Sequence, residues 1–140
     1  MSSKRTAIVT GASQGIGAAL VEALLNAGYN IVATSRNVNQ SLAASSNLVL
    51  VAGDIGNKDT AVKVVVAAME NFGSIDLLVT NAGIFSTKPF IEFTTDDFNA
   101  LVSTNLLGFL YVTQLAVEQM LKQRAGAVVS ITAEIGRAHV

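Results

Sequence analysis

The sequence predicts an α/β protein with a doubly wound parallel sheet of about five strands. Three observations support this prediction. Short apolar runs rich in β-branched residues alternate with stretches whose apolar residues recur at helical spacing. Three glycines stand between the first apolar run and the first helical stretch. The chain has 140 residues, 51% of them hydrophobic and 14% charged, which is enough for one domain with a substantial core.

The expected strands are short and apolar, as buried parallel strands are. They cover residues 6–9, 29–34, 48–52, 75–80 and 127–132. The first helix follows the glycines and ends at Gly28, with apolar residues at Ile16, Leu20, Ala23, Leu24 and Ala27. This alternation of strand and helix implies right-handed crossovers between parallel strands.

Two more helices are expected. The first runs from an N-cap at Asn57 to Gly73, with Val62, Val65, Met69 and Phe72 on its apolar face. The second has Thr95 as its cap and then Asp96 and Asp97, whose carboxylates suit the positive end of a helix. Its apolar stripe comprises Phe98, Leu101, Val102, Phe109, Val112, Ala116 and Met120, and Gly108 is expected to break or bend it. Residues 37–47 are polar and hold at most a brief helix.

Composition excludes several classes of function. The formal net charge is −1 and there is no dense Lys/Arg run, so we expect neither a nucleic-acid nor a membrane partner. No run approaches the length of a transmembrane span. The chain has no cysteine and a single histidine, His139, so no metal site is expected. The lack of cysteine is compatible with a reducing cytoplasm.

The segment Thr10–Gly17 has the chemistry of a phosphate cradle. Glycine has no Cβ, so a phosphate can approach the main chain closely. The N–H groups of the first helical turn, at the positive end of the helix dipole, then hold the anion. A nucleoside triphosphate loop would have a lysine here, and Gln14-Gly15-Ile16 has none. The alternative is a glycine-rich turn without a ligand.

The segment TGASQGIG resembles the cofactor loop of the classical short-chain dehydrogenase/reductase family, which has Thr-Gly-x-x-x-Gly-x-Gly at this place. The resemblance implies an NAD(P)-dependent oxidoreductase with a Rossmann-type sheet, and we expect the strand order 3-2-1-4-5. Hydride would pass between the nicotinamide and a small alcohol or carbonyl substrate. The resemblance also implies that the following residues of this loop bind the cofactor: Thr10, Gly11, Ser13, Gln14, Gly15, Ile16 and Gly17.

Three later positions carry the same resemblance. Asp54, followed by Ile55, resembles the aspartate that helps to bind adenine, and its alternative role is to organise its own turn. Asn81-Ala82-Gly83 resembles the Asn-Asn-Ala-Gly signature, with Thr80 replacing the first asparagine, and its alternative is a strand-ending turn. Asn105 matches the asparagine implicated in proton relay and is the catalytic candidate. It lies on the predicted apolar stripe, so the alternative is a buried core amide that bonds a neighbouring backbone.

Cofactor choice is predicted from the end of the second strand. An acidic residue there would accept from the ribose 2′-hydroxyl of NAD, whereas an arginine would meet the 2′-phosphate of NADP. The residues are Ser35 and Arg36, which favours NADP(H) over NAD(H). Gln14 argues mildly for NAD(H), because related NADP-linked enzymes often have a basic residue in that place. Arg36 alternatively is a solvated loop residue.

The resemblance fails toward the C-terminus. The hallmark Tyr-x-x-x-Lys is absent, since Tyr29 and Tyr111 are followed four residues later by Ala33 and Leu115. The place of the family's catalytic serine falls at or next to Ala133, and neither Ser130 nor Thr132 is a secure substitute. The pattern is lost at Glu134.

We therefore expect residues 1–133 to be a partial NAD(P)-binding domain, incomplete at the edge of its fifth strand, and residues 134–140 to be a non-native tail. The parent enzyme, which the resemblance implies to be a homo-oligomer, would catalyse oxidoreduction. The 140-residue chain by itself is expected to bind a dinucleotide without turning it over, because it lacks the proton donor.

Overall fold

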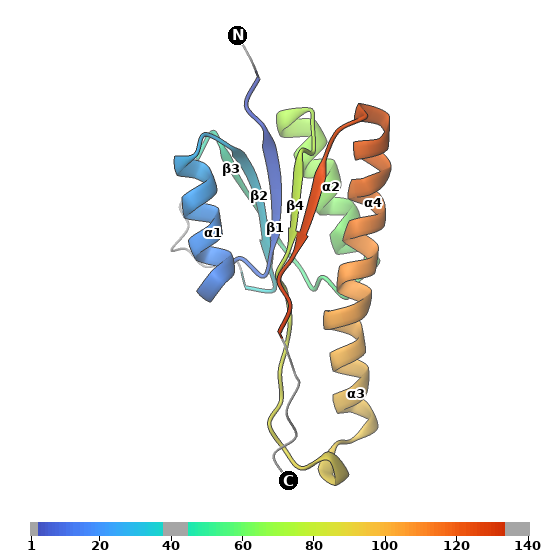
Figure 1. Cartoon of the computed structure of the whole chain (residues 1–140). Helices are drawn as coiled ribbons and strands as arrows, with labels where there is room; N and C mark the ends of the chain where they lie inside the picture. Colours follow the sequence, from blue (N-terminus) through green and yellow to red (C-terminus); the bar gives the residue numbers. More distant parts are fainter. Residues whose placement is uncertain (1–2, 38–44, 134–140) are drawn as a thin grey trace.

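The computed structural model describes residues 3–37 and 45–133. They form a five-stranded parallel sheet in the order β3-β2-β1-β4-β5 (Figure 1). The strands are β1 (Thr6–Thr10), β2 (Asn30–Ser35), β3 (Leu48–Ala52), β4 (Leu77–Thr80) and β5 (Ala127–Ser130). The predicted fold class and strand order are thus confirmed, and every strand end lies within two residues of the expected one. Residues 38–44 of the expected brief helix lie outside the described residues.

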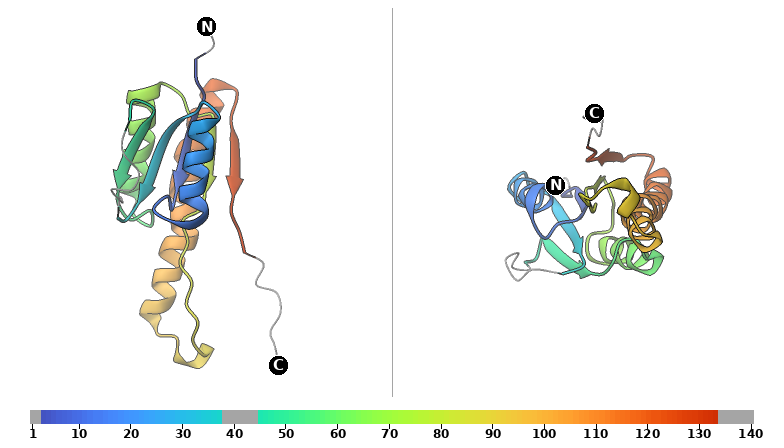
Figure 2. Two further views of the ribbon diagram at one scale, coloured as in Figure 1. Left: turned by 90° about the vertical axis from the view of Figure 1, so that its left-hand side faces the viewer. Right: turned by 90° about the horizontal axis from the view of Figure 1, so that it is seen from below.

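Helices cover both faces of the sheet (Figures 1 and 2). The helical elements are α1 (Gly15–Asn26), α2 (Lys58–Phe72), η1 (Phe90–Glu92), α3 (Thr95–Leu101), the π-helical turn η2 (Val102–Leu107) and α4 (Gly108–Gln123). On one face, Val21 of α1 packs with Val9 and Ile31. On the other, α2 and α4 pack together over Ile8 and Leu78. Two apolar clusters therefore sandwich the sheet, as in a doubly wound fold.

Local sequence explains where most helices begin and end. The side chain of Asn57 accepts a hydrogen bond from the Asp59 N–H at 3.0 Å, and α2 stops at Gly73, whose φ is 77°. These predicted ends are confirmed. The cap of α3 is Thr94 rather than Thr95, because Thr94 and Asp97 form a capping box in which each side chain accepts from the other residue's backbone N–H.

The predicted apolar faces are only partly right. In α2 the fully buried apolar residues are Ala61, Val64 and Ala68, whereas Val62 is 41% exposed. In the long helical stretch, Val112, Ala116 and Met120 are buried and three other stripe residues are about half exposed: Phe98, Val102 and Phe109. The first part of this stretch extends past the end of the sheet (Figure 1), so its apolar residues have no strand to cover.

Gly108 has a different role from the one predicted. The helix changes from a π-turn to an α-helix there, and its backbone stays helical with φ −60°. A Cβ on Gly108 would lie 2.7 Å from Cγ2 of Ile55. The glycine therefore lets the helix approach the end of the loop after β3 closely.

One helical stretch, Thr95–Gln123, is long and apolar enough to cross a membrane by length and composition. An 18-residue window of it has a mean hydropathy of 1.5, and 17% of that window is buried. The expectation that no segment approaches such a span is wrong. Residues of its second half, Val112 and Ala116, have no exposed surface and pack against the sheet together with α2. The core helix of a folded domain passes the same test, so this finding is weak evidence for a membrane.

The fifth strand is an exposed edge of the described sheet. All four residues of β5 are exposed, and their backbone pairs with β4 in parallel register from Leu77↔Ala127 to Thr80↔Ser130. Val129 is 47% exposed, although it is in register with the buried Val79. The view from below in Figure 2 shows β5 at the border of the sheet.

Candidate functional site

A groove of about 450 Å3 lies at the carboxyl edge of the sheet, where ligands of open α/β folds bind. Four segments of chain at the carboxyl ends of the strands form most of it, namely the glycine loop, the end of β2, the loop after β3 and the loop after β4, and Thr104 of η2 completes it. We call it the main groove. Twelve of the predicted cofactor-binding residues line it, namely Gly11, Ser13, Gln14, Gly15, Ile16, Ser35, Arg36, Asp54, Ile55, Asn81, Ala82 and Gly83.

The N-terminus of α1 borders the main groove without a side-chain cap. Gln14 is the N-cap residue, yet its side chain makes no capping bond, and the first turn holds no acidic residue. The helices α2 and α3, in contrast, are capped by Asn57 and Thr94. Because the first N–H groups of a helix have no intrahelical partner, this end of α1 suits an anion. Gly15 at the same place has a φ of 57° and no neighbour within 4 Å of a Cβ position, so the backbone there is open to a ligand.

Two other glycines let the main chain of the site pack closely. A Cβ on Gly11, whose φ is 64°, would lie 2.8 Å from Cα of Ala82. A Cβ on Gly17 would collide with the carbonyl of Gly11 and with the side chain of Asn81. Gly17 does not line the groove, but it allows α1 to pack closely against Gly11 and Asn81. Side chains at these two positions would push the glycine loop away from the loop after β4.

Thr10 and Asn81 fix those two loops to each other. The Thr10 hydroxyl accepts hydrogen bonds from the backbone N–H groups of Asn81 and Ala82, both at 3.0 Å. The Asn81 side chain donates through Nδ2 to the carbonyl of Gly11 at 3.1 Å. Thr10 is 2% exposed and does not line the groove. It supports the site through the backbone it holds.

Asp54 is exposed at the rim of the main groove and also organises its own turn. Its Oδ1 accepts from the Gly56 N–H at 2.9 Å, which is the structural role left open as an alternative. A carboxylate has about four lone-pair sites. This bond therefore leaves acceptor capacity for an amine in the groove, and the two roles are compatible. Ile55, which follows, is 6% exposed.

Ser35 and Arg36 stand side by side at the end of β2. The Ser35 hydroxyl donates to the carbonyl of Asn37 at 2.7 Å, so it would have to exchange this bond in order to donate to a phosphate. Arg36 is exposed and forms no ion pair with any residue in the ranges 3–37 and 45–133. The guanidinium is thus the cation of the groove, and Asp54 is its anion.

Asn105 differs from its predicted environment. It is exposed rather than buried, because the π-turn lies beyond the sheet edge. Its side chain clamps the backbone of Ile84: Oδ1 accepts from the Ile84 N–H at 2.8 Å and Nδ2 donates to the Ile84 carbonyl at 3.0 Å. This is the backbone bonding that was the alternative to a proton relay. Both of these side-chain groups are used, so the clamp holds the wall of the main groove to which Ile84 belongs.

A smaller cavity of about 290 Å3, the side pocket, lies between β5 and the long helix. Asn105, Ser130 and Thr132 line it, and Ala82 separates it from the main groove, since it lines both. Ser130 accepts from the Thr80 hydroxyl at 2.8 Å. Ser130 and Thr132 line the same pocket, as strand alternation predicts.

Five further residues line the main groove that the sequence did not single out, namely Thr34, Asn37, Gly53, Ile84 and Thr104. Each is directly adjacent in the sequence to a predicted site residue. This adjacency is the signal that could have found them.

Within the described residues no group of three His, Asp or Glu side chains is close enough to hold a metal ion, and His139 lies outside them.

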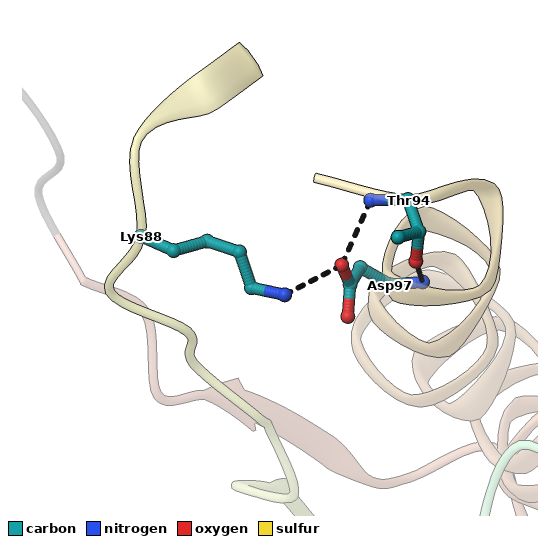
Figure 3. Close-up of polar contacts among 3 residues, drawn as sticks. All are labelled: Lys88, Thr94 and Asp97. Atoms are coloured by element: carbon teal, nitrogen blue, oxygen red, sulfur yellow. Dashed lines mark hydrogen bonds and ion pairs between the residues drawn. The ribbon is translucent and has the colours of Figure 1, made fainter. Parts of the chain in front are cut away.

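A second polar cluster, away from the groove, joins the loop before η1 to the start of α3 (Figure 3). The Lys88 ammonium lies 2.7 Å from Oδ2 of Asp97 and 5.5 Å from the ring centroid of Phe93. The hydrogen bond from Lys88, with further bonds from Thr94, lowers the pKa of Asp97 from 3.8 to about 2. This cluster anchors the far end of the long helix and contributes no group to the groove.

Residues 5–140 match the short chain dehydrogenase family. The chain is 31% identical over 134 residues to an oxidoreductase of Botryotinia fuckeliana, a match that covers 92% of this chain and 49% of that protein. It therefore spans about half the length of this curated relative.

Solved structures give the same result. A short-chain dehydrogenase from Streptomyces avermitilis has a TM-score of 0.87 and 28% identity, covering 95% of this chain and 50% of that one. ElxO, in a structure with NADP bound, has a TM-score of 0.83 and 30% identity, covering 93% of this chain and 56% of that one. The chain belongs to the short-chain dehydrogenase family, whose members are oxidoreductases that bind a nicotinamide dinucleotide and act on small molecules.

Proposed function

We propose that these residues form the dinucleotide-binding part of an NAD(P)-dependent oxidoreductase acting on an alcohol or carbonyl compound. The main groove carries this proposal. Four segments expected to bind the cofactor converge there beside the uncapped N-terminus of α1. The cofactor, when bound, supplies or accepts the hydride, and the chain's own residues bind and orient it.

Each part of the groove suits a different part of a dinucleotide. The N–H groups from Gly15 onward, with the dipole of α1, suit the pyrophosphate. Asp54 and Ile55 offer an acceptor and an apolar surface to the adenine. The loop after β4, held by Thr10 and by the Asn105 clamp, leads from the main groove to the side pocket. We assign the nicotinamide and the substrate to that end.

We propose further that the cofactor is NADP(H) rather than NAD(H). The end of β2 presents Arg36 and no acidic residue, and an arginine meets the 2′-phosphate. The structure of the relative ElxO with NADP bound supports this choice. Ser35 takes part only if its hydroxyl leaves the carbonyl of Asn37.

The chain of 140 residues by itself is proposed to bind the cofactor without turnover. The chain contains no Tyr-x-x-x-Lys, and the side pocket is lined by Ser130 and Thr132, whose aliphatic hydroxyls are poor proton donors. General acid catalysis needs a donor whose pKa is near the working pH. The substrate and the oligomeric state belong to the complete enzyme, for which a small alcohol or carbonyl compound, a homo-oligomer and a cytoplasmic location are our proposals.

Titration calorimetry with NADPH and NADH tests this proposal. We expect one saturable site, tighter for NADPH, and no oxidation of NADPH when carbonyl compounds are added. Two glycine variants give a matched comparison, because Gly15 and Gly28 both have positive φ and no neighbour within 4 Å of a Cβ. Gly15→Ala is expected to weaken NADPH binding, whereas Gly28→Ala, away from the groove, leaves it unchanged. Failure of the folded wild-type chain to bind either dinucleotide would refute the proposal, and turnover would refute its second part.

A further inference from the structure

The hydroxyl of Thr34, a residue that lines the main groove, is buried and unpaired among the described residues. Thr34 is 1% exposed and lines the groove at the end of β2. Its Oγ1 has no hydrogen-bond partner among residues 3–37 and 45–133. A buried hydroxyl without a partner carries a desolvation penalty, and such groups are rare in folded proteins. We therefore looked for a ligand atom that could pair with the Thr34 hydroxyl.

The hydroxyls of Thr10 and Thr80, at the same edge of the sheet, both have partners. Thr34 is in register with Thr10, whose hydroxyl accepts two backbone N–H groups. On the next strand, Thr80 donates to Ser130. Because residues in register on parallel strands share a face, these hydroxyls form a row along the carboxyl ends of the strands. Only the member of this row that borders the main groove lacks a partner within the described residues.

The surroundings of Thr34 point to the class of ligand. Its backbone carbonyl accepts from the Ala12 N–H at 3.1 Å, which places it beside the glycine loop. Ser35 and Arg36 follow it in sequence, and Gly53 lies across from them, since the Gly53 N–H donates to the carbonyl of Ser35 at 3.0 Å. Thr34 thus lies under the part of the groove that we assign to the adenosine half of the dinucleotide.

We propose that Thr34 is a cofactor-binding residue whose hydroxyl is paired only when the adenosine half of a dinucleotide occupies the main groove. This inference rests on the proposed function. The partner is a polar ligand atom or one water held by the ligand, both of which offer the same hydrogen-bond chemistry. In the free protein the unpaired hydroxyl lowers stability, and binding relieves that penalty. The hydroxyl therefore favours ligand binding but lowers the stability of the free protein.

Substitutions that differ only in the hydroxyl test the proposal. Thr34→Val has nearly the same shape without the hydroxyl, and Thr34→Ser and Thr34→Ala differ from each other by the hydroxyl alone. Thr113→Val is the matched control, because the Thr113 hydroxyl on α4 is also buried and unpaired among the described residues but lines neither cavity. Each variant is titrated with NADPH and with 2′,5′-ADP, which represents the adenosine half, and its thermal midpoint is measured without ligand.

We expect Thr34→Val to bind both ligands about 3- to 10-fold more weakly, the effect of one hydrogen bond. Its midpoint without ligand is expected to equal or exceed that of the wild type. Thr34→Ser should bind more tightly than Thr34→Ala by a similar factor, which keeps the test valid if the valine variant does not fold. Thr113→Val should have unchanged affinity.

The outcomes separate the two proposals. Wild-type binding of NADPH with equal affinity in Thr34→Val, or with equal affinity in the serine and alanine variants, overturns the inference and leaves the proposed function standing. Equal weakening in Thr113→Val also overturns it, since the effect would then come from packing in general. A folded wild-type chain that binds neither NADPH nor 2′,5′-ADP overturns both.

Discussion

Replacing Thr10 by valine should destabilise the fold and weaken the site together. The Thr10 hydroxyl is the acceptor for two backbone N–H groups, at Asn81 and Ala82, both 3.0 Å away. Valine keeps the shape but accepts no hydrogen bond. Each donor left unsatisfied costs about 1–3 kcal/mol, and both donors are only partly buried, so we expect a total loss of about 2–4 kcal/mol. Thr10→Ser keeps the acceptor and loses one methyl group, at a cost of about 1 kcal/mol.

Urea unfolding followed by circular dichroism measures this difference. With a slope of about 2 kcal/mol/M, the Thr10→Val midpoint should fall by about 1–2 M, and that of Thr10→Ser by about half a molar unit. NADPH affinity should fall in the valine variant, because Asn81 and Ala82 line the main groove. A valine variant as stable as the serine variant would contradict the assignment of the hydroxyl as the structural acceptor.

Three more predictions follow from single contacts. Gln123→Ala should lower the free energy of unfolding by about 1–3 kcal/mol in urea titrations, because the side chain accepts from the Ile75 N–H at 3.0 Å and donates to its carbonyl at 2.8 Å; unchanged stability would show that these bonds contribute nothing. Arg36→Glu should reverse the preference for NADPH over NADH in calorimetry, and an unaltered preference would remove Arg36 from the phosphate site. Asp97→Asn should be less stable than the wild type, with the full difference above about pH 4 and none as the pH falls toward 2. The reason is that the pKa of Asp97 in the folded state is lowered to about 2. A difference in stability that persists at pH 2 would exclude the Lys88 pair as its cause.

The fold could be predicted because its signals are local and repeated. Asn57 and Gly73 bound α2 as expected, because a side-chain cap and a left-handed glycine act on the residues next to them. Four glycine-loop and strand-end segments meet in one groove because the carboxyl ends of parallel strands share an edge. That consequence of topology needs no side-chain detail.

Packing direction was harder to predict. In α2 we expected Val62 on the apolar face, but the residues without exposed surface are Ala61, Val64 and Ala68, which belong to the core cluster over the sheet. Asn105 is exposed because it lies in the π-turn Val102–Leu107 beyond the end of the sheet, and no pattern in the sequence indicates such a turn. We predicted Thr95 as the cap of α3, but the cap is Thr94, and the spacing from Thr94 to Asp97 is that of a capping box.

The hydroxyl of Thr34, which has no partner among the described residues, is a feature that could not be predicted from the sequence. The sequence assigns Ser35 and Arg36 to cofactor binding but not Thr34, which precedes them. Whether a strand hydroxyl finds a partner depends on atoms from β1, β3 and the glycine loop, which come from distant parts of the chain. Such a group is visible only once the strands are placed.

A map of backbone amide shifts during NADPH titration of the isotope-labelled chain tests most directly whether the main groove binds a dinucleotide. We predict that the largest changes fall in the four segments of the main groove: residues 11–17, 34–37, 53–56 and 81–84. The N-terminus of α2, capped by Asn57, should remain unchanged. Changes confined to other surfaces, or no changes in a folded chain at saturating NADPH, would contradict the assignment of this groove to a dinucleotide.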